Sequence, residues 1–222
     1  MPEIIRQVAQ SSDDAFRCQA FASFFSLTER NIVGSTALTV PRNGCGIRFT
    51  NIIIPNAATI LNAYLTITYE SAAANIYCNS QISAEAVDDA ITFADDWVAF
   101  DTRRTNITTA TVNWDNIPLG DALGALLKPY NSPNIATIIQ EMVDRPGWVS
   151  GNDLVIFWDD FDNRTAPVSP ANYAARWAYS YDDNSELAPW LTIVTDPAPL
   201  YISDNDLGVT RKAFWLNRIK ER

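Results

Sequence analysis

The sequence predicts an all-β domain built as a sandwich or a barrel, and two observations lead to this prediction. Stretches in which apolar and polar residues alternate recur along the chain, with the period of a strand that has one buried face. Between them stand short segments rich in Pro, Gly and Asn, which favour turns. Many short strands separated by turns are typical of β-sandwiches and barrels.

The clearest predicted strand covers residues 61–69, where every second residue is apolar: Leu61, Ala63, Leu65, Ile67 and Tyr69. The same alternation predicts shorter strands at 110–114, 175–181 and 190–193. The run from Leu154 to Trp158 is apolar throughout, as expected for a strand that is buried on both faces or covered by a loop.

One amphipathic helix interrupts the strand pattern. Ser132 and Pro133 have the residue types favoured at a helix N-cap and at the first helical position. Apolar residues then recur with helical spacing up to Val143, and Pro146 and Gly147 end the pattern. A single helix of this kind in a β protein is expected to cap one open end of the sandwich with its apolar face.

A change of composition near residue 196 predicts two parts, a domain over residues 1–196 and a C-terminal arm over 197–222. Pro197 and Pro199 make a stiff exit that cannot continue a strand. Residues 209–222 carry a net charge of +4, which leaves −14 on the preceding 208 residues. An acidic body with a basic tail favours contact between copies.

The arm also holds apolar residues in a predicted short helix that begins near Asp206. A helix this short is not stable alone in water, so it is expected to dock either on its own domain or on a neighbouring subunit. The residues predicted to make the subunit contact are basic or apolar: Arg211, Lys212, Phe214, Trp215, Leu216 and Ile219.

Composition argues against several functions. The net charge of −10 has the wrong sign for binding a phosphate backbone, so we expect no nucleic-acid partner. The chain contains no His, which excludes Ser-His-Asp and Cys-His catalysis and His-ligated zinc. Its three Cys are widely spaced, and we expect them to be buried and reduced.

Membrane insertion and export are not expected. No apolar run approaches the roughly 18 residues needed to cross a bilayer. The amino terminus lacks the basic start and apolar core of a signal peptide, so we expect a protein made in the cytoplasm of the cell that synthesises it.

A series of fragments follows a characteristic order: Ser11–Ala15, Ile47–Pro55, Ala58–Ile60, Ala63–Leu65, Thr111–Asp115, Ile138–Trp148, Ser150–Leu154, Ser180–Asp182 and Ala188–Ile193. Together they resemble the jelly-roll modules known as DNRLRE or disaggregatase-related domains, which are similar in fold to carbohydrate-binding modules. The resemblance covers about residues 3–195 and implies a jelly-roll β-sandwich.

This family occurs on secreted surface proteins and polysaccharide-active enzymes, and also among phage structural proteins. The sequence shows no export signal, no partner catalytic domain and no repeat of the module, so we expect the phage setting. The resemblance then implies a non-enzymatic virion protein, as a capsid decoration, head-associated or tail component, with itself and other virion proteins as partners. The alternative is an extracellular carbohydrate-binding module or adhesin domain for cell-surface polysaccharide.

Five Asp-Asp doublets lie mostly in predicted loops, where acidic side chains stay solvated. A glycosidase needs two carboxylates about 5 to 9.5 Å apart across a cleft, and neighbours in sequence do not establish that geometry, so no enzymatic activity is expected. We expect no cofactor beyond one candidate structural calcium ion, a cation that binds carboxylate oxygens. Its first predicted ligands are Asp13 and Asp14.

Seven Trp residues are available for stacking on a sugar, but most are expected to pack in the core, Trp114, Trp148 and Trp177 among them. Trp97 follows an acidic doublet in a predicted loop, and Trp190 points away from the apolar face of its strand. Trp97 and Trp190 are therefore the predicted glycan-binding residues, although an exposed ring serves equally well as an interface anchor.

Overall fold

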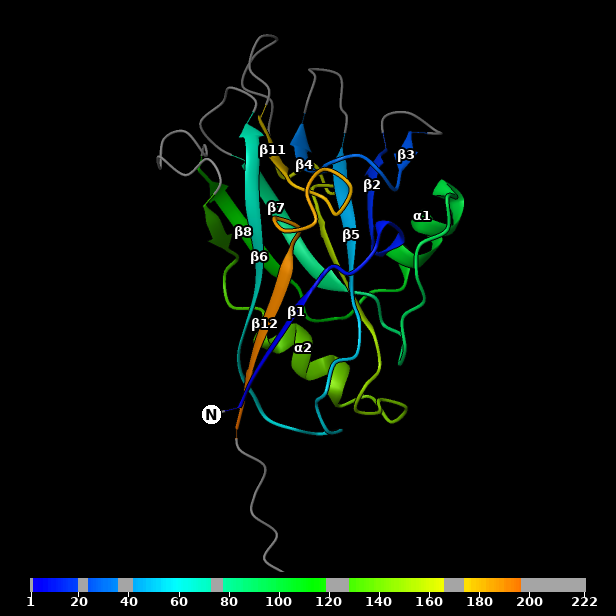
Figure 1. Ribbon diagram of the computed structural model, residues 1–222, viewed down its shortest axis with the longest axis vertical. Helices are drawn as coiled ribbons and strands as arrows, with labels where there is room; N and C mark the ends of the chain where they lie inside the picture. The colour runs from blue at the N-terminus through cyan, green and yellow to red at the C-terminus, as the bar shows by residue number, and fades with distance from the viewer. Residues whose placement is uncertain are drawn as a thin grey trace, which may run out of the picture.

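The computed structural model describes residues 2–19, 24–35, 42–72, 78–118, 128–165 and 174–196, which form an antiparallel jelly-roll β-sandwich (Figure 1). The first sheet has the strand order β1 (Glu3–Gln7), β12 (Trp190–Thr195), β6 (Ile60–Ala72) and β9 (Pro129–Asn131). The second has the order β5 (Asn43–Phe49), β10 (Leu154–Asp159), β7 (Cys78–Ala84) and β8 (Val112–Ile117). The chain crosses repeatedly between these sheets, as jelly-roll connectivity requires.

Four further strands of the described ranges extend and join the sheets. β2 (Asp14–Cys18) pairs with β5 and follows a single 3-10 turn, and β3 (Phe25–Ser26) pairs with β2. β11 (Ala174–Ala178) pairs with the second half of β6 and with β4 (Asn31–Ser35). β4 in turn meets β5 at one residue pair, so the two layers are linked along one edge.

The core lies between the two sheets and contains most of the apolar face predicted for residues 61–69, although Thr66 and Thr68 of the opposite face are buried as well. Ala63, Leu65, Ile67 and Tyr69 are all fully buried. Leu61, which the pattern placed on the same face, is half-buried instead, and Ile60 is buried near the point where the pairing with β12 shifts register.

β10 is buried on both faces, as its continuous apolar run predicts. Ile156 and Trp158 face the core between the sheets. Val155 and Phe157 face a second apolar cluster on the outer side, which the helix α1 (Trp97–Thr105) covers with Phe100. α1 is absent from the sequence prediction, and Asp96 caps it by accepting hydrogen bonds from the backbone N–H groups of Val98 and Ala99.

The predicted capping helix is present as α2 (Ala136–Val143), which closes the lower end of the sandwich in Figure 1. Its buried residues are those of the predicted stripe: Ile138, Ile139, Met142 and Val143. The predicted start was wrong, because the backbone N–H groups of Ser132 and Ile135 donate hydrogen bonds to β6, and the helix begins only at Ala136. Ser132 Oγ accepts a hydrogen bond from Leu65 N rather than capping the helix.

Neither α1 nor α2, the α-helices of the described ranges, has the length and apolar character needed to cross a bilayer. The described chain ends at Asp196, whose backbone N–H donates a hydrogen bond to Thr59 O. The predicted arm and its contact residues, Arg211, Lys212, Phe214, Trp215, Leu216 and Ile219, lie outside the described residues.

Candidate functional site

Two of the five acidic doublets, Asp13–Asp14 and Asp159–Asp160, are tied into the protein's own hydrogen bonds and ion pairs rather than left in solvent. Asp13 pairs with Arg48 at 2.5 Å, and Asp159 pairs with Arg104 at 2.5 Å. Asp160 accepts hydrogen bonds from two backbone N–H groups of the turn that follows it. Asp13, Asp14, Asp159 and Asp160 are each only 1% exposed, so the expectation of solvated loop carboxylates was wrong for these doublets.

Asp14 is the most unusual acid among them. Its Oδ2 accepts hydrogen bonds from Asn31 Nδ2 at 2.9 Å and from Tyr181 N at 3.0 Å. Its Oδ1 and the Oδ1 of Asn31 are buried and have no hydrogen-bond partner in the described part of the chain. Burial, reinforced by the negative charges of Asp182 and Asp13, raises the pKa of Asp14 to about 7.

The predicted calcium ligands Asp13 and Asp14 turn to different partners. Arg48 already neutralises the Asp13 carboxylate, while Asp14 contacts an amide and a backbone N–H group. Within the residues that the structure describes, no group of three or more His, Cys, Asp or Glu side chains is placed to hold a metal ion. A calcium ion shared by this doublet stays a prediction, and the observed partners do not favour it.

The two predicted glycan-binding tryptophans lie on opposite outer faces of the sandwich. Trp97 is not in a loop but opens α1, outside the second sheet, and the Arg17 guanidinium lies 5.1 Å from the centre of its ring. Trp190 opens β12 and faces away from the buried Leu191 and Ile193, as its strand pattern predicts. Both rings are half-buried, and their positions exclude a single platform formed by the pair.

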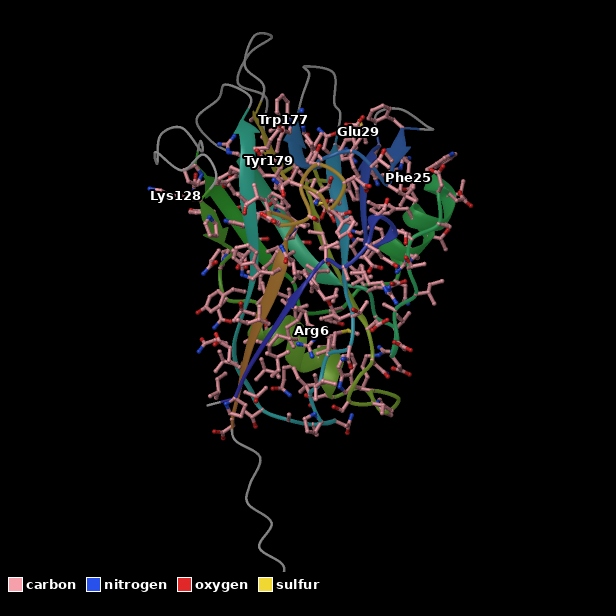
Figure 2. The ribbon with its side chains drawn as sticks, in the orientation of Figure 1. Arg6, Phe25, Glu29, Lys128, Trp177 and Tyr179 are labelled. Atoms are coloured by element: carbon pink, nitrogen blue, oxygen red, sulfur yellow. The ribbon has the colours of Figure 1, made fainter. Side chains whose placement is uncertain are left out.

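A crevice of about 280 Å³ brings together aromatic residues that the sequence analysis did not connect. Phe16 and Phe24 meet edge to face with ring centres 5.7 Å apart, and Trp177 shares the same crevice. Glu29 and Asn43 add a carboxylate and an amide to its lining. Figure 2 shows Trp177 and Glu29 at the end of the molecule opposite α2.

Trp177 was expected in the core but is half-buried, and its indole Nε1 is buried without a hydrogen-bond partner among the described residues. The crevice combines apolar rings with a few polar groups, which is the usual make-up of a small-ligand site. No sequence signal connects its members, because strand pairing alone brings β2, β4 and β11 to one edge.

A second depression, of about 460 Å³, lies at the end of the molecule where β1 begins and β12 ends. We name it the terminal groove. Its lining is mainly apolar, and Ile53 in its wall is 50% exposed. Asp196, the last described residue, is part of the lining, so the described chain ends at the groove.

The fold defines this protein as a jelly-roll β-sandwich with an aromatic crevice at one end and the terminal groove at the other. No protein-family model matches the chain, and a search of curated proteins finds no match either. The resemblance to the DNRLRE or disaggregatase-related modules accordingly stays a prediction.

Proposed function

We propose that this chain is a non-enzymatic virion structural protein, a capsid-associated or tail component whose jelly-roll body assembles through its C-terminal arm. One observation carries the proposal: the chain leaves a compact acidic body beside an exposed apolar groove and continues into a basic, apolar segment. Opposite charge on body and arm favours association between copies.

The surroundings of the acidic side chains support a non-enzymatic role. Hydrolysis by paired carboxylates needs two of them facing a common cleft. Asp13, Asp88 and Asp159 each bind an Arg of the same chain instead, and Asp96 caps α1. These carboxylates stabilise the protein's own turns and loops, which is a structural role.

Removal of residues 197–222 tests the proposal. We expect the shortened chain to stay folded and soluble, because the strand pairs of the body end before Asp196. It should lose self-association, and its association constant should fall about tenfold or more, which corresponds to about 1.4 kcal/mol. Sedimentation velocity measures the assembly, circular dichroism the fold, and a particle preparation the incorporation.

A full-length chain with Arg211→Glu and Lys212→Glu is the matched control for the deletion. It keeps the length of the arm and reverses two of its positive charges. Weaker association in both variants supports contact through the basic arm. If both variants assemble and incorporate as the parent chain does, the arm has no part in assembly and the proposed function fails.

A second candidate function, binding of cell-surface polysaccharide, is favoured by the aromatic crevice. Phe24 and Trp177 offer apolar surface to a sugar and Glu29 offers a hydrogen-bond acceptor, over a floor that includes the buried Phe16 and Asn43. Trp177 lines this crevice, and its indole N–H has no hydrogen-bond partner among the described residues. The crevice is therefore a better candidate site than Trp97 or Trp190.

A glycan array with three single variants tests this second function. Trp177→Ala should weaken binding about tenfold or more while Trp97→Ala and Trp190→Ala leave it within about twofold, because only Trp177 of the three lines the crevice. Thermal unfolding of each variant controls for folding. An array without any bound glycan removes this candidate function altogether, and loss only in Trp97→Ala or Trp190→Ala moves the site to that residue.

A further inference from the structure

The terminal groove has the chemistry of a docking site for an apolar segment. The apolar residues of its lining include Ile4, Ile53, Pro55, Ala57 and Ala58. Ile53 in its wall is 50% exposed. A large apolar side chain exposed in a mainly apolar depression marks a candidate contact site in a soluble protein.

The lining of the groove, as the described residues form it, carries one charged side chain, the carboxylate of Asp196, and no Lys or Arg. A mainly apolar lining with a carboxylate at its edge fits a segment that combines apolar and basic side chains.

Residues 211–220 have this pattern. Phe214, Trp215, Leu216 and Ile219 are apolar, and basic residues stand on both sides of them at Arg211, Lys212, Arg218 and Lys220. Aromatic residues and Arg are also the types that contribute most to protein–protein binding. We infer that this arm segment of a second copy of the chain occupies the terminal groove.

The length of the chain allows this placement. Residues 197–213 separate the groove from Phe214, and an extended chain covers about 3.3 to 3.6 Å per residue, so the segment reaches well beyond its own body. Pro197 and Pro199 favour a stiff, extended backbone directly after Asp196, which opposes an immediate turn back into the same groove. This favours a neighbouring copy as the occupant, and the inference rests on the proposed assembly function for the presence of that copy.

Disulfide trapping between two differently tagged full-length variants tests the inference. One chain carries Ile53→Cys in the groove, and the other carries Leu216→Cys in the arm. The native Cys18, Cys45 and Cys78 are buried and do not compete under mild oxidation. We expect a cross-linked heterodimer that depends on both introduced cysteines, because docking raises the local concentration of the two thiols.

Ile91→Cys paired with Leu216→Cys is the matched control, since Ile91 is 73% exposed and lies outside the groove lining. The groove pair should cross-link about tenfold faster or more than this control, as expected for partners held together. Equal rates overturn the inference. A chain carrying both Ile53→Cys and Leu216→Cys that closes a disulfide only within itself overturns it as well, since the occupant is then its own arm.

The arm deletion described above separates this inference from the proposed function. If the deletion abolishes assembly while Ile53→Cys and Ile91→Cys cross-link equally, the arm binds a neighbour at another surface. The function then stands and the groove assignment falls. If the deletion leaves assembly intact, the proposed function falls whatever the cross-linking rates are.

Discussion

At the scale of single residues, Asp14 shows what burial does to a carboxyl group. It lies at the start of β2, where Asn31 of β4 and the turn at Tyr181 enclose it. Two hydrogen bonds favour the ionised form, yet desolvation outweighs them and the pKa rises to about 7. The folded protein therefore holds a proton at Asp14 that the unfolded chain releases above about pH 4.

This proton makes the stability depend on pH. Between about pH 4 and pH 7 the folded state binds more protons than the unfolded state, so the free energy of unfolding decreases as the pH rises. Asp14 alone lowers the free energy of unfolding by up to about 4 kcal/mol over this pH range, at about 1.36 kcal/mol per pH unit. Burial also raises the pKa of Asp160, to about 6, and that of Asp159, and both add slope of the same sign.

We predict that Asp14→Asn flattens this dependence and stabilises the protein above pH 7. The amide has nearly the same shape, carries no charge to desolvate, and still offers an oxygen to Asn31 Nδ2 and Tyr181 N. Urea unfolding from pH 4 to pH 8 measures the slope. Asp95→Asn, which alters an exposed carboxyl, should leave the slope unchanged. Parallel pH curves for Asp14→Asn and the parent protein would contradict the assignment.

At the scale of elements, the two helices differ in how visible they are in the sequence. α2 has an apolar stripe with helical spacing, and its existence was predicted correctly. α1 buries only Phe100, and a helix with one buried residue leaves no stripe to detect. Its visible signal is Asp96, an N-cap residue type in front of Trp97.

The wrong start of α2 has a cause that lies outside the helix. Ser132 and Pro133 have the right chemistry for a helix start, but β6 supplies acceptors for the backbone N–H groups of this stretch. Strand pairing therefore outweighs a local preference for helix. Strand pairing also decides where β11 ends. The apolar alternation predicts a strand over 175–181, but β11 ends at Ala178.

We predict that Ile139→Ala lowers the free energy of unfolding by about 2 to 5 kcal/mol. Ile139 is 1% exposed and belongs to the core cluster that α2 closes, so its truncation leaves a cavity at the end of the sandwich. Thr137→Ala, an exposed change on the same helix, should alter stability by less than about 0.5 kcal/mol. Equal effects in urea unfolding would show that α2 does not seal the core.

At the scale of the whole molecule, composition and strand pattern predicted the all-β sandwich, and the division of charge at the arm is also visible in the sequence. The pairing partners are not visible, because alternation does not say which strands meet. For this reason Arg48, the partner of Asp13, was missed, and so was the crevice formed by Phe16, Phe24 and Trp177. Both depend on contacts between residues far apart in the chain.

The pairing of β1 with β12 has a consequence for how the protein is made. The first strand hydrogen-bonds to the last, so β1 has no partner until residue 195 has left the ribosome. Contacts of such long sequence separation place a domain among those that fold in milliseconds to seconds. During synthesis the unpaired backbone of β1 is a template for aggregation, and early release of a chain shorter than β12 would leave that template permanently exposed.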